Sequence, residues 1–455
     1  MTDHASNARE FNKDHEMVSW HNESLWYVRQ KRDRARDEVS NWELLRDKAS
    51  EIKLHTLDNL RNYLIDFEKN ALQNGWHVHW ASDAGRHNRI VLDILKQKGL
   101  NRVVKSKSML TEECGLNDYL EDHGISIIDT DLGERIVQLA RKPPSHIVLP
   151  AIHLRKKEIG SLFQEHLDAD PDSEDPLYLT RLARKSLRNY LQQASAAISG
   201  VNFGLAGEGA VVVCTNEGNA DMGIHHADTY IASMGIEKLI PGMGDLPVFL
   251  ELLARSATGQ PVTTYTSHLK KPPEGKSWHI VLVDNGRTEI LARHKYREIL
   301  KCIRCGACIN TCPVYRRSGG YSYGYTIPGP VGSVLAPLHD IKEHRSLPYA
   351  SSLCGSCTDV CPVKIDLHEM LFRLRADVAG KVHLPLGKRW MLFLLDQILY
   401  RRSLYNLIGS AGRILLKYMP AAFVKNRFIV WTRSREIPEF PKERFRDWYK
   451  RNHTS

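Results

Sequence analysis

Seven of the nine cysteines of this 455-residue chain fall in two runs whose spacing is that of iron–sulfur ligands. The first run consists of Cys302, Cys305, Cys308 and Cys312, and Pro313 follows it. This C-x2-C-x2-C-x3-C-P spacing lets three thiolates of one tight loop bind one cubane, whereas the cysteine before proline ligates the other cluster of a two-cluster protein. The second run consists of Cys354, Cys357 and Cys361, and Pro362 follows it. The pattern therefore predicts two clusters that exchange their fourth ligands.

The second run lacks its first ligand, because Ser351 stands where the spacing requires a cysteine. With the crossed pattern, one 4Fe-4S cluster is expected on Cys302, Cys305, Cys308 and Cys361, and a second cluster on Cys312, Cys354 and Cys357. The second site is then either a 4Fe-4S cluster with an unusual or exchangeable fourth ligand, or a 3Fe-4S cluster. Ser351 could ligate as an alkoxide, but a hydroxyl is a poor ligand for a soft metal, and solvent or a partner protein could equally supply the ligand.

Two other uses of these cysteines fit less well. A structural zinc site takes four ligands in two pairs, which seven cysteines with two Cys-Pro endings exceed. Disulfides are disfavoured because the cysteine count is odd and the spacing is that of metal ligands. Of the remaining two, Cys214 ends the apolar run 210–214 and is expected to be buried, while Cys114 has no evident partner.

The composition, 42% hydrophobic and 25% charged, is that of a globular protein, and the length predicts two or three domains. The formal charge of +10 does not indicate nucleic-acid binding, because basic residues mostly alternate with acidic ones and no basic-aromatic module accompanies them. The first residues lack the apolar core of a signal peptide, and no stretch has the roughly 18 apolar residues of a membrane span. We therefore expect a cytoplasmic protein, free or associated with the inner face of the membrane.

The elements that must position the cysteines fall into four regions. Residues 1–75 are expected to form two or three amphipathic helices, in which His15, Trp20, His21 and Trp26 pack or dock rather than bind a cofactor. Residues 76–290 alternate short apolar strands with helix-length segments and predict an α/β domain with a largely parallel sheet. Its strands are expected at 76–80, 102–105, 125–129, 146–149, 210–213 and 279–283. Residues 291–380 carry the cysteine runs, and residues 381–455 form a helical tail.

The loop after Cys214 is the candidate binding loop of the α/β domain, because loops at the carboxyl ends of parallel strands carry ligands. In it, Asn216, Glu217, Asn219 and backbone amides could hold a small anionic or carbonyl ligand. The alternative is a glycine-permitted turn whose asparagine side chains satisfy the backbone. No G-x-G-x-x-G follows the first strand, so NAD binding is not supported.

Three segments flank the cysteines. The stretch 318–332, rich in glycine, tyrosine and proline, is expected to cover a cluster, to dock a partner or to serve as a linker. A helix is expected to begin at Pro362, with Asp366 and Glu369 as a capping-box pair. In the tail, the apolar run 390–400 is flanked by basic residues and is expected to contact a partner subunit rather than lie on a membrane surface.

Several motifs together resemble the lactate utilisation protein B (LutB) family. They are 105–109, 111–113, 144–153, 200–222, 234–238 and the double cysteine run. The resemblance implies a LUD domain similar to the NagB/RpiA/CoA-transferase-like fold, followed by an α-helical ferredoxin-like domain with two iron–sulfur clusters on the seven cysteines. It also implies that Ser351 belongs to the family pattern rather than marking a damaged site.

The resemblance implies oxidation of L-lactate to pyruvate together with two partners, a cysteine-rich LutA-like subunit and a LutC-like LUD protein. Because iron–sulfur clusters move single electrons and provide no base or hydride acceptor, the chain is expected to be the electron-transfer subunit. In a second hypothesis, the LUD domain itself binds and oxidises a 2-hydroxy acid near Asn216 to Asn219. In others, the subunit serves a different substrate such as glycolate, or the LUD domain is only a scaffold. The electron acceptor is not evident from the sequence.

Overall fold

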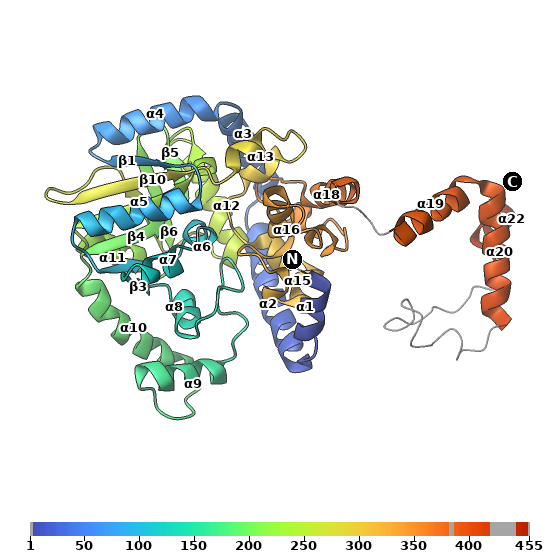
Figure 1. Cartoon of the computed structure of the whole chain (residues 1–455), viewed down its shortest axis with the longest axis horizontal. Helices are drawn as coiled ribbons and strands as arrows, with labels where there is room; N and C mark the ends of the chain where they lie inside the picture. Colours follow the sequence, from blue (N-terminus) through green and yellow to red (C-terminus); the bar gives the residue numbers. More distant parts are fainter. Residues whose placement is uncertain (1–2, 382–385, 419–442, 454–455) are drawn as a thin grey trace. The chain divides into compact units, whose positions relative to one another are not determined.

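The computed structural model describes residues 3–381, 386–418 and 443–453 (Figure 1). The chain divides into two compact units, Met1–Lys381 and Val382–Ser455. The first unit contains an α/β part and a helical part that carries all seven cysteines of the two runs. We describe the two units separately.

A six-stranded parallel sheet forms the centre of the α/β part, with the strand order β1-β10-β7-β4-β2-β3. These strands are β1 (His77–Ala81), β10 (Ser277–Val283), β7 (Thr229–Gly235), β4 (Ala196–Gly200), β2 (Arg102–Lys105) and β3 (Ser126–Asp129). Side chains alternate between its two faces, since Ile280 and Leu282 belong to one buried cluster and Val281 and Val283 to another. The predicted α/β class and parallel sheet are confirmed.

A smaller four-stranded sheet lies beside the first, in the order β8-β5-β6-β9. Its strands are β8 (Leu239–Ile240), β5 (Phe203–Leu205), β6 (Ala210–Thr215) and β9 (Tyr265–Leu269). The predicted strand 210–213 is β6, but it pairs antiparallel with β5 and β9 and is not part of the parallel sheet. The reason is the tight turn before it, which folds β6 directly back on β5.

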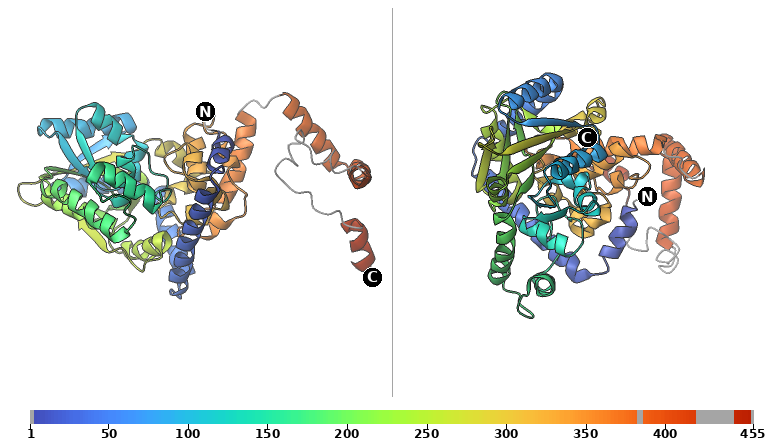
Figure 2. Two further views of the ribbon diagram at one scale, coloured as in Figure 1. Left: turned by 90° about the horizontal axis from the view of Figure 1, so that it is seen from below. Right: turned by 60° about the vertical axis from the view of Figure 1, so that its left-hand side comes forward.

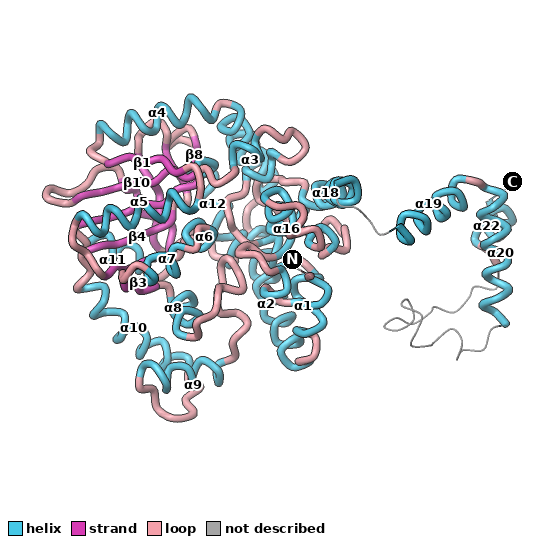
Figure 3. The backbone as a smooth tube through the Cα atoms, viewed as in Figure 1, coloured by secondary structure: helices cyan, strands magenta, loops and turns pink. Residues whose placement is uncertain are grey.

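Helices cover both faces of the large sheet, as Figure 3 shows with the strands in magenta. In chain order, the helices of the α/β part are α5 (Ala84–Gln97), α6 (Met109–Glu113), α7 (Leu116–Asp122), α8 (Leu132–Leu139), α9 (Lys156–Leu167), α10 (Pro176–Gln192), α11 (Asn219–His226), α12 (Leu246–Thr258) and α13 (Arg287–Leu291), with the short 3-10 helix η1 (Ile236–Lys238). Of these, α9 packs on α8 and α10, and α12 packs on α2 (His15–Asp37) and α3 (Trp42–Asp58), rather than on the large sheet. Apolar residues of α5 and α7 pack on one face of the sheet, and those of α10 and α11 on the other. Such a three-layer arrangement leaves the carboxyl ends of the strands free to form a site.

The segment 146–149, predicted as a strand, is an irregular turn. The His146 ring explains the difference, because Nδ1 accepts hydrogen bonds from the amides of Val148 and Leu149, both at 3.0 Å. The other ring nitrogen, Nε2, lies 2.9 Å from Oδ1 of Asn310, beside the first cysteine run. These apolar residues are therefore buried against the cysteine-bearing part and not in a sheet.

The N-terminal region is helical, as predicted, but residues 3–75 form four helices rather than two or three. Its helices are α1 (His4–Phe11), α2 (His15–Asp37), α3 (Trp42–Asp58) and α4 (Leu60–Gln73). Helix α2 packs against α12 and the cysteine-bearing helices, and the blue and orange ribbons of Figure 2 lie side by side. His21 is fully buried, with Nδ1 3.0 Å from the carbonyl oxygen of Arg316, and the guanidinium of Arg316 stacks on Trp26 at 4.6 Å. His21 and Trp26 therefore pack against the cysteine-bearing part, as expected.

Short helices carry the cysteines. They are η2 (Arg297–Lys301), α14 (Ala307–Thr311), α15 (Pro313–Ser318), η3 (Tyr321–Tyr323), α16 (Gly329–His339), η4 (Leu347–Tyr349), α17 (Ser356–Asp359) and α18 (Leu367–Lys381). Helix α18 begins at Leu367 and not at Pro362 as predicted, because a turn follows Pro362 and Lys364 adopts a positive φ of 47°. Asp366 caps the helix by accepting a hydrogen bond from the amide of Glu369 at 3.4 Å.

The stretch 318–332 is packed rather than a free linker. Tyr323 is fully buried, and the hydroxyl of Tyr321 donates a hydrogen bond to the carbonyl oxygen of Pro143 at 2.8 Å. A Cβ on Gly320 would lie 1.8 Å from the carbonyl oxygen of Ser145, so only glycine permits this approach. The stretch therefore fastens the α/β part to the cysteine-bearing part.

The second unit contains α19 (Leu386–Tyr400), α20 (Arg402–Tyr418) and α22 (Phe445–His453). In α19, the large apolar side chains from Trp390 to Leu395 are exposed within the described part of this unit. None of the helices in the described ranges is long and apolar enough to cross a bilayer. The rest of the predicted tail, at 382–385, 419–442 and 454–455, lies outside the described residues.

Candidate functional site

The structure brings the seven cysteines of the two runs into two neighbouring groups. Burial raises the pKa of the Cys305 thiol, and the nearby thiols of Cys361 and Cys302 raise it further. The pKa of Cys357 rises to about 12 through burial and through its neighbours Cys312 and Cys354. Cysteines far apart in the sequence, Cys361 with the first run and Cys312 with the second, are therefore neighbours, as the crossed pattern predicts.

The Cys308 thiol of the first group lies near the second group. Burial raises the pKa of Cys308, and the nearby thiols of Cys302 and Cys305 in the first group and of Cys357 in the second raise it further. The two candidate sites are thus adjacent. Cys354 of the second group is the exposed cysteine of the seven, whereas Cys312 and Cys357 of that group are buried like Cys305 and Cys361 of the first.

The two cysteine loops repeat one backbone conformation. Around the second cysteine of the first loop, Arg304 and Gly306 have φ angles of 60° and 77°. Around Cys354 in the second loop, Leu353 and Gly355 have φ angles of 56° and 79°. Left-handed conformation is unusual for arginine and leucine, so its recurrence at matched positions indicates the same loop built twice.

Backbone amides point at the sulfur atoms. The amides of Arg304, Tyr315 and Ile365 donate to Cys302, Cys312 and Cys361 at 3.4, 3.5 and 3.4 Å. Hydrogen bonds of this kind stabilise thiolate charge and tune the potential of a bound cluster. On the outer side, Arg46 of α3 donates to the carbonyl oxygens of Cys361 (3.0 Å) and Asp359 (2.7 Å), which fixes a cation beside the thiols.

These residues fit an iron–sulfur group. Among the described residues, no three His, Cys, Asp or Glu side chains converge closely enough to hold a single metal ion. A cubane does not require such convergence, because each thiolate binds a different iron. The first group offers four thiols and the second offers three, and the chemistry they would support is one-electron transfer.

A cavity of about 520 Å³ adjoins the first cysteine loop. Its walls come from the carboxyl ends of β2, β4, β6 and β7, from the segment 147–152 and from α12. Ile303, Arg304 and Cys305 complete the wall. A ligand in this cavity would therefore contact both the α/β part and a candidate cluster ligand.

The predicted loop residues Asn216, Glu217 and Asn219 all line this cavity. Their polar atoms also serve the protein itself. Asn216 Oδ1 accepts the amide of Thr264 at 3.1 Å, and Asn219 donates to Thr130 Oγ1 at 3.1 Å. Both roles considered for this loop, lining a pocket and satisfying neighbouring groups, are therefore combined in it. The assignment of Asn216, Glu217 and Asn219 as cofactor-binding residues remains a prediction.

Glu217 differs from the two asparagines. Its Oε2 accepts the amide of Leu132 at 3.1 Å, and burial together with the nearby Asp131 raises its pKa. The raised pKa favours the uncharged carboxyl, which can donate as well as accept a hydrogen bond.

Arg287 holds two carboxylates at the inner wall of the cavity. It lies 2.5 Å from Glu237 and 3.0 Å from Glu113, and all three side chains are buried. Burial opposes charge on Arg287, but the two carboxylates raise its pKa above the ordinary range. The guanidinium therefore stays charged and rigid.

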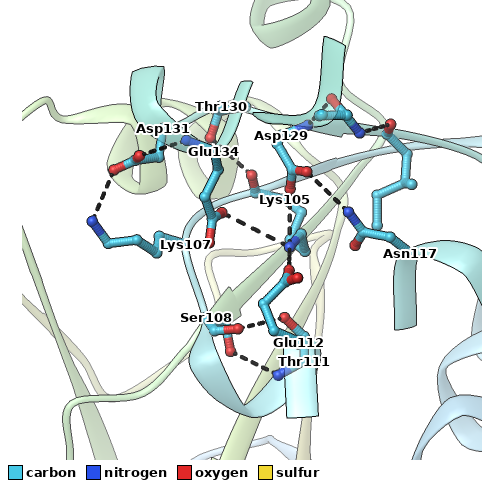
Figure 4. Close-up of polar contacts among 12 residues, drawn as sticks. Lys105, Lys107, Ser108, Thr111, Glu112, Asn117, Asp129, Thr130, Asp131 and Glu134 are labelled. Carbon is cyan, nitrogen blue, oxygen red and sulfur yellow. Dashed lines mark hydrogen bonds and ion pairs between the residues drawn. The ribbon is translucent and has the colours of Figure 1, made fainter. Parts of the chain in front are cut away.

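A second buried charge cluster lies beside the cavity, where β2 and β3 end (Figure 4). The Lys105 ammonium lies 2.5 Å from Glu112, 2.9 Å from Asp129 and 3.8 Å from Glu134, and is itself fully buried. Neither oxygen of Glu134 has a hydrogen-bond partner among the described residues. Burial and the neighbouring carboxylates raise the pKa of Glu134 well above its ordinary value, although Lys105 opposes the rise. With one lysine facing three carboxyl groups, burial favours the protonated form of Glu134 more than it would be favoured in water.

Lys105, Arg287, Lys238 and Arg304 were not among the predicted site residues. The motifs 105–109 and 234–238 supported only the family resemblance, and the pattern of charges gave no indication that these side chains are buried.

Comparisons with known proteins agree with the two-part architecture. The LUD domain profile matches residues 64–286, and the 4Fe-4S dicluster domain profile matches residues 298–365. "Lactate utilization protein B" of Bacillus cytotoxicus is 41% identical over 431 residues, which cover 92% of this chain and 90% of that protein. The protein of the same name from Bacillus cereus is 41% identical over 439 residues with the same coverage. A crystal structure of a DUF162 family protein from Deinococcus radiodurans aligns with 49% of this chain and 98% of that one, at 12% identity and a TM-score of 0.27.

Proposed function

The chain belongs to the lactate utilization protein B family, and we propose that it is the iron–sulfur electron-transfer subunit of a multi-protein system that oxidises L-lactate to pyruvate. A LUD domain and a 4Fe-4S dicluster domain make up most of the chain. When bound at the two cysteine groups, the clusters would supply one-electron transfer. The observation that carries the proposal is the pairing of Cys361 with the first run and of Cys312 with the second.

The positions of the two groups support a route for the transfer. Cys305 faces the cavity of the LUD domain, whereas Cys354 is exposed at the surface. Cys308 lies near both groups, so no large gap separates the two candidate sites. Electrons would enter at the group beside the cavity and leave at the exposed group, or travel in reverse.

The partners are part of the proposal: a cysteine-rich LutA-like subunit and a LutC-like LUD protein. The exposed apolar side chains of α19 support a contact with a partner subunit. The proposal also includes the finer fold assignment, a NagB/RpiA/CoA-transferase-like LUD domain and an α-helical ferredoxin-like domain, which the parallel sheet and the short cysteine-bearing helices support.

A second candidate function is favoured by the cavity. In it, the LUD domain itself binds a 2-hydroxy acid, and Asn216, Glu217 and Asn219 contribute to the site. If the LUD domain were only a scaffold, it would not need a cavity that is lined by Cys305.

The test is genetic and spectroscopic. In the organism that encodes this chain, its deletion is expected to abolish growth on L-lactate, and the wild-type chain but not a Cys305→Ala variant is expected to restore it. In parallel, L-lactate added with the partner proteins is expected to reduce the clusters of this chain. Growth restored by Cys305→Ala, with its iron content lowered, would contradict the proposal.

A further inference from the structure

Two stacked arginine–aromatic pairs lie beside the second cysteine loop, 351–357. In one, the guanidinium of Arg316 on α15 lies 4.6 Å from the ring centre of Trp26 on α2. In the other, the guanidinium of Arg375 on α18 lies 5.3 Å from the ring centre of Tyr349. Trp26 is 43% exposed and Tyr349 is 51% exposed, so both pairs are open to contact from outside.

The contacts of the two arginines show how close the pairs are to this loop. Arg375 donates a hydrogen bond to the carbonyl oxygen of Ser351 at 2.7 Å. Burial raises the pKa of Cys312, the nearby Cys354 raises it further, and Arg316 lowers it. Arg316 and the exposed Cys354 therefore lie near the same thiol, and both pairs border the second cysteine group.

Helix α2 is held against the same loop by Arg29. The guanidinium of Arg29 donates a hydrogen bond to Oγ1 of Thr311, which lies 2.6 Å from Oγ of Ser356 in the second cysteine loop. The charge of Arg29 is already matched, because the carboxylate of Asp33 lies 2.7 Å from it. These contacts fix the position of α2, and with it that of Trp26, beside the second cysteine group.

The other arginines leave this surface positively charged. Arg316 contacts an aromatic ring, and Arg375 contacts a ring and two carbonyl oxygens; neither forms an ion pair with any residue in the described ranges. Arg317, directly after Arg316, is exposed and has no ion pair within those ranges either. The acidic Asp359, which follows the loop, lies near Arg36. A surplus of positive charge thus lies beside the exposed cysteine.

This combination of residues suits a brief contact with an acidic protein. Tryptophan, tyrosine and arginine are the residues most enriched at the points that contribute most to protein–protein binding. Stacking holds the guanidinium groups in place before a partner arrives, so less side-chain entropy is lost on contact. A positive surface also speeds the encounter with a negatively charged partner.

We propose that Trp26, Arg316, Arg317, Tyr349 and Arg375 form a docking surface for a small acidic protein that carries single electrons. The inference rests on the proposed function, because the docked carrier exchanges its electron with the second cysteine group. One electron moves in each encounter. A flavin carrier that arrives as the hydroquinone leaves as the semiquinone, and the electron it has lost reduces the group beside the surface.

The test measures electron transfer to the anaerobically purified full chain with its clusters. Flavodoxin hydroquinone, an acidic donor, is mixed with the oxidised chain in a stopped-flow instrument. In a parallel series, oxidised cytochrome c, a basic carrier, is mixed with the reduced chain. We expect the rate constant for flavodoxin to fall about tenfold with added salt, because the Debye length shrinks from about 10 Å at about 0.1 M to about 3 Å at about 1 M. The rate constant for cytochrome c should not fall.

Substitutions locate the effect on the docking surface. Arg316→Gln and Arg317→Gln are each expected to lower the flavodoxin rate constant about threefold to tenfold in low salt and to leave it unchanged in high salt, because such charges act on the encounter. Arg316→Lys keeps the charge and should retain most of the rate. Arg184→Gln, exposed on α10, is the matched control. Equal iron content in all variants would show that cluster assembly is unaffected.

Two results would overturn the inference. One is a flavodoxin rate constant that does not depend on salt, or that Arg316→Gln and Arg317→Gln leave unchanged. The other is sedimentation of the chain with anionic phosphatidylglycerol vesicles that both substitutions abolish, since the surface would then serve a membrane. In either case, reduction of the clusters by L-lactate and the partner proteins would leave the proposed function standing. Protein without clusters would instead contradict the proposed function.

Discussion

Ser351 occupies in the second cysteine loop the position that Cys302 occupies in the first. Cys302 Sγ accepts a hydrogen bond from the amide two residues later, at 3.4 Å, and Ser351 Oγ accepts the equivalent one from Leu353 at 3.1 Å. The guanidinium of Arg375 holds the carbonyl oxygen of Ser351 at 2.7 Å. The backbone at Ser351 therefore has the local hydrogen bond found at the ligand position Cys302, although the side chain is a hydroxyl.

Ser351→Cys is expected to complete the second set of thiolates. Because thiolate is a far better ligand for iron than a hydroxyl, the variant should lose iron from the second site several-fold more slowly in air than the wild type does. Iron content and the EPR signal of an oxidised three-iron cluster measure the loss. Ser346→Cys, in the preceding turn, controls for the added thiol. Equal rates of loss in Ser351→Cys and the wild type would show that this position does not face the second site.

Cys361→Ala and Cys312→Ala should have crossed effects. Cys361 belongs to the second run but neighbours Cys302, so its loss should abolish the EPR signal of the first cluster and leave that of the second. Cys312→Ala should do the reverse, since its neighbour is Cys354. Cys214→Ala, outside both runs, should change neither. If each variant instead lost the cluster of its own run, the crossed assignment would be wrong.

The charge cluster at Lys105 predicts opposite effects for two substitutions. Lys105→Met leaves the buried Asp129 and Glu134 and the half-buried Glu112 without their cation and should lower the free energy of unfolding by about 3–5 kcal/mol. Glu134→Gln removes a surplus carboxyl and should keep or raise stability. Because the pKa of Glu134 is raised in the fold above its ordinary 4.5, its contribution is present below pH 4.5 and is lost as pH rises toward the folded-state pKa.

Denaturant unfolding between pH 5 and 8 measures this effect. The advantage of Glu134→Gln over the wild type is expected to grow with rising pH. Glu165→Gln, which is exposed, is the control. A Lys105→Met variant as stable as the wild type would contradict the assigned charges.

His279 predicts a loss of stability in acid. It is 8% exposed, and burial, with help from His77, His79 and Lys98, lowers its pKa from 6.5 to about 3. The unfolded chain therefore binds a proton that the fold does not, and stability falls as pH decreases from 6.5 toward 3. The loss is about 2 kcal/mol at pH 5.

The His279→Gln variant isolates this effect, because it cannot take up a proton. Its unfolding free energy should fall less than that of the wild type between pH 7 and pH 5, while the exposed His226→Gln serves as control. Parallel curves for His279→Gln and the wild type would rule out the assignment.

The parts of this account that could be predicted from sequence are local. The cysteine spacing and the α/β alternation are short-range patterns, and the prediction of a binding loop at 216–219 depends only on its place directly after a strand. The strand predicted at 146–149 was wrong because His146 contacts Asn310, while Ile147 and Val148 lie against Gly306 of the cysteine loop. Burial of Lys105 and Lys238 depends on strands and loops distant in sequence, so their charges could not be distinguished from solvated ones.

The most direct test of the central claim is iron and sulfide analysis with EPR on anaerobically purified protein, as isolated and after dithionite reduction. The account predicts about seven to eight irons per chain with matching sulfide, and two magnetically interacting signals, because the two cysteine groups are adjacent. About eight irons would indicate two cubanes, and about seven, with a signal in the oxidised state, a three-iron second cluster. Stoichiometric zinc without sulfide would contradict the electron-transfer function altogether.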